Sequence, residues 1–190
     1  MEALKQKILT EGKAIGTGTV KVDGFLNHQI DVKFMDELGK EFGRRFSDAK
    51  VDKILTVEAS GIAIACMTAP YFGYPPVVFA KKTAPNTMTE DFYGAEAKSF
   101  TKGTVSIIRV SKNYLREGER VLILDDFLAH GEASMAMTQL VKQAGAQVAG
   151  IGAVIEKGFQ GGGRKLRDAG YRLESLAIID KIEDGIIQFL

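Results

Sequence analysis

The sequence predicts an α/β fold in which a mainly parallel sheet is covered by helices on both faces. From residue 31 onward, short apolar runs rich in β-branched residues alternate with helix-like stretches, the order that produces parallel sheets. The run at residues 121–124 is apolar at every position, which is typical of a strand buried on both faces. With 190 residues, of which 45% are hydrophobic, the chain is long enough for one such core but short for two.

The first predicted core helix begins after Asp31, whose side chain is a suitable N-cap. Met35, Leu38, Phe42 and Phe46 follow at three- and four-residue spacing, so one face of this helix is apolar. The other regular elements of the core are short and apolar. We expect strands at residues 53–57, 77–80, 121–124 and 148–155, and helices at residues 62–72 and 133–143.

A different pattern covers residues 81–95. This segment is polar, contains a proline and lacks the period of either a helix or a strand. Long irregular segments in compact domains are often functional, so we expect a flap over a binding site. Residues 98–101 and 104–110 then flank Lys102 and Gly103, which predicts a hairpin with a two-residue turn.

The two ends of the chain fit the alternation of strands and helices less well. We expect residues 1–31 and 156–190 to pack together as a small hood on a core formed by residues 32–155, within one domain. Residues 16–18 and 158–164 are rich in glycine but lack the lysine of a Walker motif and the context of a dinucleotide fingerprint. Both are predicted to be turns.

Charge and composition exclude several classes of protein. Lys and Arg number 25 against 24 Asp and Glu, whereas a general nucleic-acid binder carries a basic excess. No apolar run approaches the roughly 20 residues that cross a bilayer, so no membrane partner is expected. Cys66 is the only cysteine, which rules out an internal disulfide and a thiolate zinc cluster. These features together predict a cytoplasmic protein.

The most informative segment is residues 121–133, where Asp125 and Asp126 follow an apolar strand and Gly131 opens a helix. Ligands of open parallel sheets bind beyond the carboxyl ends of the strands. Two adjacent acids at that edge can hold a ribose diol, and the unpaired amides and positive dipole of a helix N-terminus favour a phosphate. The segment therefore predicts a ribose 5-phosphate site. The alternative is that the two acids only cap a turn and a helix.

An apolar strand, two acids, a short loop and a helix in this order resemble the phosphoribosyl-diphosphate signature of the type I phosphoribosyltransferases. Other segments are similar to the xanthine-specific bacterial members of that family, namely residues 25–31, 58–63, 76–82 and 150–157. The resemblance implies the type I phosphoribosyltransferase fold, with a hood made from both termini. It also implies a purine-salvage reaction in which xanthine and phosphoribosyl diphosphate give xanthosine monophosphate and diphosphate. A Mg²⁺-dependent, cytoplasmic homodimer with small-molecule substrates is the further expectation.

The same resemblance assigns the catalytic role to Asp125 and Asp126. They would hold the ribose hydroxyls and stabilise the positive charge that develops on the sugar as diphosphate departs. The 5-phosphate is expected on the backbone amides of the next loop, formed by Ala129, His130, Gly131, Glu132 and Ala133. This loop departs from the wider family, which usually has hydroxyl side chains there. Because a carboxylate repels a phosphate, we expect Glu132 to point outward or to serve the helix N-terminus.

The diphosphate is expected on a loop of mostly small residues, which permit close approach of the backbone, namely Glu58, Ala59, Ser60 and Gly61. The family implies a cis peptide bond in this loop. The alternative for Ser60 is an ordinary helix N-cap. Lys81 and Lys82 are placed to neutralise the departing diphosphate, in their own chain or across a dimer. The alternative is that both are solvated surface lysines.

The purine is expected in the hood, because Val20, Asn27 and Lys157 match family positions that contact the base. An amide and an ammonium suit the two exocyclic oxygens of xanthine. Phe159 either stacks on the purine ring or belongs to the core. No protein ligand is assigned to Mg²⁺, which we expect to be held mainly by phosphoribosyl diphosphate and diphosphate.

Two alternative functions stay open. The base is guanine, hypoxanthine or adenine in the first, since guanine and hypoxanthine share one exocyclic oxygen with xanthine. In the second, the chain is a non-catalytic sensor of purines or phosphoribosyl diphosphate, because transcriptional regulators also use this fold. The near-neutral charge argues against the regulator. Rates with each purine and a DNA-binding assay separate these possibilities.

Overall fold

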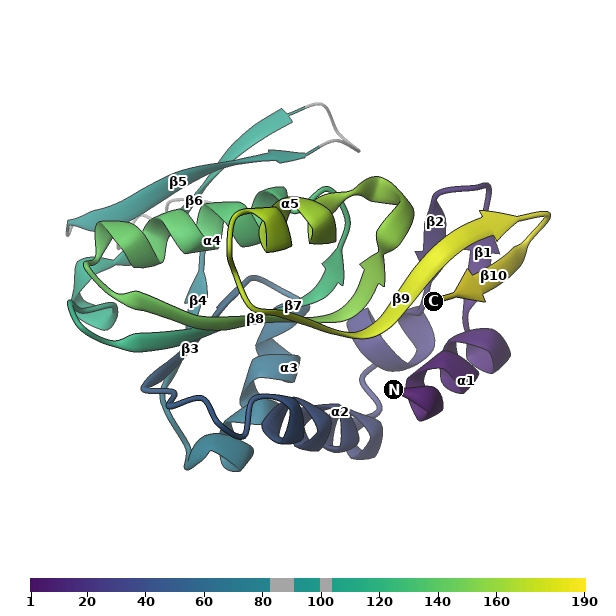
Figure 1. Ribbon diagram of the computed structural model, residues 1–190, viewed down its shortest axis with the longest axis horizontal. Helices are drawn as coiled ribbons and strands as arrows, with labels where there is room; N and C mark the ends of the chain where they lie inside the picture. Colours follow the sequence, from purple (N-terminus) through teal and green to yellow (C-terminus); the bar gives the residue numbers. More distant parts are fainter. Residues whose placement is uncertain (83–90, 100–103) are drawn as a thin grey trace.

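The computed structural model describes residues 1–82, 91–99 and 104–190. Within these residues, the main sheet has six strands in the order β10-β9-β8-β7-β3-β4 (Figure 1). Neighbouring strands from β9 to β4 are parallel and β10 is antiparallel to β9, which confirms the predicted, mainly parallel sheet. The strands are β3 (Lys53–Val57), β4 (Val77–Ala80), β7 (Arg120–Leu128), β8 (Gln147–Lys157), β9 (Leu173–Glu183) and β10 (Ile186–Phe189).

Helices cover both faces of the sheet (Figure 1). The helices α2 (Val32–Arg45) and α3 (Gly61–Thr68) lie on one face, and α4 (Glu132–Gln143) and α5 (Gly162–Asp168) lie on the other. Each face has its own cluster of buried apolar side chains. Since both faces are covered, residues 121–124 of the central strand β7 have no exposed surface, as their uniformly apolar sequence predicts.

The ends of the predicted helices follow from local chemistry. Asp31 caps α2, because its Oδ1 accepts a hydrogen bond from the backbone N–H of Phe34 at 3.1 Å. The helix predicted at residues 62–72 is α3 followed by the 3₁₀ helix η2 (Ala69–Phe72), since Pro70 has no N–H to continue an α-helix. The predicted capping of α2 and the stop before Gly73 are both confirmed.

A separate antiparallel hairpin, β5 (Phe92–Ser99) and β6 (Thr104–Ser111), lies over α4 (Figure 1). The prediction of an irregular segment up to residue 95 is wrong at its end, because β5 begins at Phe92. Tyr93, Ala95 and Ala97 alternate toward the core, and their pairing with β6 keeps this weakly patterned segment extended. The predicted flap residues 83–90 and the turn at residues 102–103 lie outside the described residues.

The two ends of the chain lie side by side (Figure 1). The terminal amino group of Met1 donates a hydrogen bond to the Leu176 carbonyl, and Lys5 Nζ donates to the Leu190 carbonyl at 2.6 Å. The sheet itself continues past residue 155 through β9 and β10, so the division into core and hood stays a prediction. The other N-terminal elements are α1 (Glu2–Glu11), β1 (Lys13–Ile15), β2 (Thr19–Lys21) and the π-helix η1 (Asp23–Asn27).

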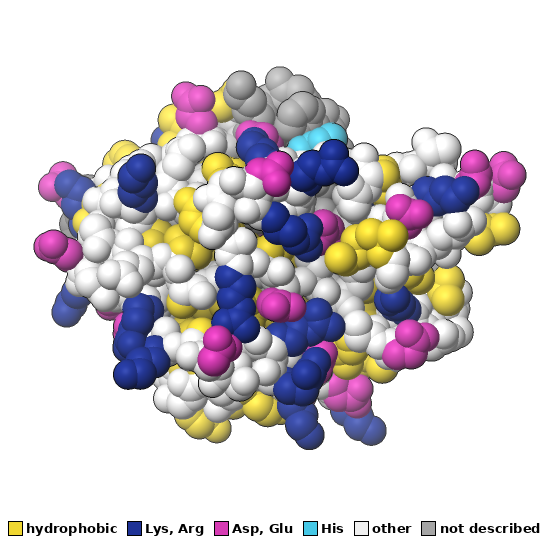
Figure 2. Space-filling view, viewed as in Figure 1, with side chains coloured by type: hydrophobic (Ala, Val, Ile, Leu, Met, Phe, Trp, Pro, Cys, Tyr) yellow, Lys and Arg dark blue, Asp and Glu magenta, His cyan; other side chains and the backbone are white. Residues whose placement is uncertain are grey.

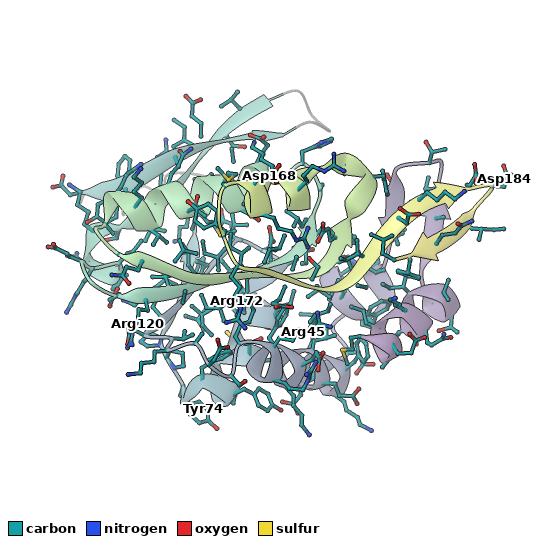
Figure 3. The ribbon with its side chains drawn as sticks, viewed as in Figure 1. Arg45, Tyr74, Arg120, Asp168, Arg172 and Asp184 are labelled. Atoms are coloured by element: carbon teal, nitrogen blue, oxygen red, sulfur yellow. The ribbon has the colours of Figure 1, made fainter. Side chains whose placement is uncertain are left out.

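The surface carries charges of both signs. Figure 2 shows basic and acidic side chains interspersed over one face of the molecule. Many of them are paired: Arg172, for example, contacts Asp48 and donates to the Arg45 carbonyl at 2.6 Å, which ties the start of β9 to the end of α2 (Figure 3). Among the described residues, no helix has the length and apolar character needed to cross a membrane.

Candidate active site

The acidic pair lies within β7 rather than after it. The sequence predicts a strand at residues 121–124 that ends before the two acids, but β7 continues through Asp125 and Asp126 to Leu128. The strand continues because its pairing with β8 extends from Arg120 to Leu128. Successive side chains of a strand point to opposite faces, so the two acids have different surroundings. Asp125 is buried, with 6% of its surface exposed, whereas Asp126 is half-buried.

The different surroundings give the two carboxylates different properties. Burial, helped by the negative charge of Asp126, raises the pKa of Asp125 well above its ordinary value. Asp126 accepts hydrogen bonds from the backbone N–H of Phe127 at 2.9 Å and from Asn27 Nδ2 at 3.3 Å. The structure therefore brings Asn27 of the N-terminal segment to the acidic pair.

The predicted phosphate loop joins β7 to α4. Gly131 has a φ of 80°, a conformation that glycine adopts without strain, and α4 begins at the next residue. Gly162, the first residue of α5, contacts this loop: its backbone N–H donates a hydrogen bond to the Ala129 carbonyl at 3.0 Å. A Cβ at Gly162 would overlap the loop backbone, so this contact requires glycine. The first amides of α4 have no partner within the helix and are available to an anion.

A pocket of ≈ 370 Å³ opens between this loop, the end of β8 and the β1–β2 turn. Lys157 enters it from the end of β8, and its Nζ donates to the Gly18 carbonyl at 2.8 Å and lies 5.5 Å from the centre of the Phe127 ring. Burial lowers the pKa of Lys157. The pocket thus combines an acid, a helix N-terminus, an amine and an aromatic ring. Its lining is Gly18, Thr19, Asp125, Phe127, Leu128, Ala129, His130, Gly131, Glu132, Ala133, Ser134, Lys157 and Gln160.

Sequence reasoning predicted part of this lining. It named the acid, the phosphate loop and Lys157, but it missed Gly18, Thr19, Phe127, Leu128, Ser134 and Gln160. Phe127 had a usable signal, since it directly follows the two acids. Gly18 and Thr19 had none, because they reach the site only through the packing of the β1–β2 turn. The segment 158–164 is not simply a turn, as predicted, but the 3₁₀ helix η4 (Gly158–Gln160) and the start of α5.

The other residues predicted to contact the purine lie around the pocket without lining it. Val20 is buried in the apolar core with 5% exposure, and Asn27 is exposed on η1. Phe159 is 40% exposed, so the alternative that it belongs to the core is wrong. The roles of these residues toward a purine stay predictions.

The predicted diphosphate loop follows β3. Its Glu58–Ala59 peptide bond is cis, as the family resemblance implies. Ser60 stands at the N-cap position of α3, but its side chain makes no capping hydrogen bond, so its hydroxyl does not cap the helix. A Cβ at Gly61 would overlap the hydroxyl of Thr56, which shows why glycine stands there. Glu58 accepts a hydrogen bond from the backbone N–H of Lys82 at 2.6 Å.

Lys81 lies outside the 370 Å³ pocket and lines a second, larger groove of ≈ 840 Å³. Its backbone N–H donates to the Arg109 carbonyl at 2.9 Å, and its Nζ lies 5.9 Å from the centre of the Phe79 ring. Phe79 and Tyr114 in this groove are 38% and 63% exposed. The groove joins the edge strand β4 to the segment that follows β6.

A family model described as the phosphoribosyl transferase domain matches residues 29–185. The chain belongs to the phosphoribosyltransferase family. The resemblance read from the acidic pair and its neighbouring segments is therefore confirmed.

Relatives of this phosphoribosyltransferase extend over its full length. It is 59% identical over 189 residues to xanthine phosphoribosyltransferase 1 of Clostridium perfringens, with all of both chains covered. It is 51% identical over 189 residues to xanthine phosphoribosyltransferase of Clostridioides difficile, again with full coverage. Among solved structures, adenine phosphoribosyltransferase of Thermoanaerobacter pseudethanolicus matches with a TM-score of 0.68 and 28% identity, covering 78% of this chain and 81% of the other.

In the part of the chain that is described, this phosphoribosyltransferase has no cluster of side chains that could hold a metal ion without a ligand. No three His, Cys, Asp or Glu side chains of these residues group closely enough to hold a metal ion. Mg²⁺ is commonly bound by one or two carboxylates together with substrate phosphates and waters. The half-buried Asp126 beside the predicted phosphate loop suits that arrangement.

Proposed function

We propose that this chain is a xanthine phosphoribosyltransferase, which transfers the phosphoribosyl group from phosphoribosyl diphosphate to xanthine and releases diphosphate. The observation that carries the proposal is one pocket in which Asp125, the N-terminus of α4 and Lys157 converge. A buried carboxylate suits sugar hydroxyls, a helix N-terminus suits a phosphate, and an ammonium suits an oxygen-rich, partly anionic base. Full-length relatives that carry this name support the choice of base.

The chemistry requires mainly positioning and charge. As the bond from the anomeric carbon to diphosphate breaks, positive charge develops on the ribose. The negative charges of Asp125 and Asp126 would stabilise this positive charge, and two ribose hydroxyls donating to Asp125 would favour its charged form. The α4 N-terminus holds the 5-phosphate, while Lys157 holds an exocyclic oxygen of the base. The base reacts as its anion, so the ring nitrogen that forms the new bond carries no proton; it attacks the anomeric carbon from the side opposite the departing diphosphate, whose bond to that carbon breaks.

A comparison of four purines as substrates tests this function. Steady-state rates are measured with xanthine, guanine, hypoxanthine and adenine at fixed phosphoribosyl diphosphate and Mg²⁺. We expect the highest kcat/KM with xanthine and weaker turnover of guanine and hypoxanthine, which share one exocyclic oxygen with it. A preference for adenine would contradict the proposed substrate. Binding of both ligands without any turnover would favour the non-catalytic sensor.

The Mg²⁺ requirement is part of the proposal. Asp126, with the oxygens of phosphoribosyl diphosphate, would hold the ion. When bound, the ion neutralises charge on the departing diphosphate. We expect EDTA to abolish turnover and added Mg²⁺ to restore it. Full activity in EDTA after dialysis would contradict this part. A cytoplasmic location is proposed with it, supported by a sequence whose single cysteine, Cys66, leaves no internal disulfide to form.

We place a second copy of the chain over the 840 Å³ groove, so that Lys81 serves the active site of the partner. The exposed Phe79 and Tyr114 support an apolar contact there. Light scattering after gel filtration is expected to give twice the 20.6 kDa of one chain. A mass of one chain would contradict the dimer.

Mixing inactive variants tests the role of Lys81 across that dimer. Lys81→Ala and Asp125→Asn are purified separately, mixed and allowed to exchange subunits. Activity is expected to reappear, because one site of each mixed dimer then has an intact Asp125 and an intact Lys81. If mixing restores nothing although mixed dimers are detected by native mass spectrometry, Lys81 acts within its own chain.

A further inference from the structure

The predicted phosphate loop contains an acidic side chain close to the amides that would bind the phosphate. Glu132 is the first residue of α4 and lines the 370 Å³ pocket, where the proposed function places the sugar phosphate. Its side chain is 23% exposed. A carboxylate favours the positive end of the helix dipole, but it repels a phosphate that binds the same amides. The loop therefore requires a nearby positive charge to offset Glu132.

Lys165 supplies that charge from outside the pocket. Its Nζ lies 2.7 Å from Glu132 Oε1, and Lys165 is not among the residues that line the pocket. The lysine belongs to α5, which lies beside α4 on the same face of the sheet (Figure 1). The Glu132 carboxylate, which lines the pocket, is thus paired with an ammonium group that lies outside the pocket lining.

The position of Lys165 is set by anchors on both sides of it along α5. Before it, Gly162 contacts the phosphate loop through its N–H. After it, Leu166 is fully buried, and Arg167 forms two hydrogen bonds of 2.9 Å with the buried Glu156 of β8. Ser175 of β9 also donates to Glu156, so α5 is fixed to the sheet beside Lys157. Figure 3 marks the C-terminal end of this helix at Asp168. These anchors therefore fix the part of α5 that carries Lys165 beside Glu132.

We propose that Lys165 is a positioning residue for the 5-phosphate: by pairing with Glu132, it cancels the negative charge at the mouth of the phosphate loop. The proposal rests on the proposed function, since it needs a phosphate in this loop. It predicts a different change in the affinity for phosphoribosyl diphosphate for each of three variants. Losing the lysine weakens binding of phosphoribosyl diphosphate, losing the acid strengthens it, and losing both returns it toward the wild-type value.

The test is a double-mutant cycle on Lys165→Met and Glu132→Gln. The KM for phosphoribosyl diphosphate and kcat are measured for each variant at saturating xanthine and low ionic strength. We expect Lys165→Met to raise this KM about twofold to fivefold, the range of a partly exposed charge pair, with kcat nearly unchanged. Glu132→Gln lowers the KM, and the double variant lies between the two. Lys165→Arg keeps the wild-type value, and added salt reduces every difference.

Lys181→Met is the matched control, because Lys181 also pairs with a carboxylate at 2.7 Å but lies on β9 away from the pocket lining. It should leave the KM unchanged. The inference is overturned if Lys165→Met has no effect, or if the double variant is as impaired as Lys165→Met. Wild-type turnover in the same assay tests the proposed function separately. If the wild type fails to turn over xanthine, calorimetric titration with phosphoribosyl diphosphate measures the same four affinities.

Discussion

At the scale of single residues, the acidic pair shows how one strand gives two adjacent carboxylates different properties. Asp125 is buried and its pKa is well above the ordinary value, because burial and the charge of Asp126 both disfavour ionisation. Asp126 is half-buried and is hydrogen-bonded to Asn27. A buried carboxylate that is costly to ionise gains most from ligand hydroxyls that donate to it. On the proposed assignment, hydroxyls of the bound sugar would offset the cost of ionising the buried Asp125.

Asp125→Asn is expected to stabilise the free protein while it lowers kcat by about a hundredfold or more. The raised pKa means that the folded state holds its proton more tightly than the unfolded state, so the stability of the wild type falls as pH rises above 3.8, the ordinary pKa. At pH 7.5 the variant should melt about 2–4 °C higher, and the gain should vanish toward pH 4. Thermal denaturation across pH measures it. A lower Tm at neutral pH would contradict the cause assigned to the shift.

Lys157→Met is expected to affect the base and not the sugar. Burial already lowers the pKa of this ammonium, and the Gly18 carbonyl holds it at the pocket. Removing it should raise the KM for xanthine about tenfold or more, with a change of less than about threefold in the KM for phosphoribosyl diphosphate. Both constants come from the same steady-state matrix. Equal increases in the KM values of the two substrates would contradict a role for Lys157 in binding the base.

At the scale of elements, local sequence patterns predicted the helix caps and strands that depend on residues close together in the chain. Asp31 caps α2, and the apolar runs of β3, β4 and β8 are strands, because capping and burial leave a direct mark on the sequence. The start of β5 and the extension of β7 were missed, since pairing with β6 and β8 decides them. The helix α5 was missed because its glycines resemble a turn. One of them, Gly162, instead allows the close contact of α5 with the predicted phosphate loop, and Gly163 leaves room for the Glu156 carboxylate.

The diphosphate loop gives a prediction at this scale. Gly61→Ala places a methyl group on the Thr56 hydroxyl, which is buried without a hydrogen-bond partner among the described residues. The overlap should cost about 1–3 kcal/mol and raise the KM for phosphoribosyl diphosphate by shifting the loop. Urea denaturation and kinetics measure the two effects. Adding Thr56→Ala should recover part of the stability, and Gly24→Ala, where the added methyl meets open space, is the control. An unchanged Gly61→Ala protein would contradict the packing.

At the scale of the whole molecule, the fold joins both ends of the chain beside the site. The α1 helix packs against β9 through its buried residues, and Lys7 of α1 pairs with Asp31 at the start of α2 at 3.0 Å. The sequence suggested that the ends pack together, but only the three-dimensional structure shows that β9 and β10 extend the central sheet. Gly18 and Asn27 of the N-terminal segment contact Lys157 and Asp126 at the candidate site.

The N-terminal helix therefore contributes to global stability. Ile8→Ala removes a fully buried side chain and should cost about 2–5 kcal/mol. Leu9→Ala, at the neighbouring and 49% exposed position, should cost less than about 1 kcal/mol. Urea denaturation followed by circular dichroism measures both. Equal losses for the two variants would show that α1 does not dock as described.

The most direct test of the proposed site is a crystal structure with phosphoribosyl diphosphate and Mg²⁺ bound. We expect the ribose hydroxyls on the Asp125 and Asp126 carboxylates and the 5-phosphate on the backbone amides between His130 and Ala133. Density for the sugar phosphate at another place, with this edge of the sheet still empty at saturating ligand, would contradict the assignment.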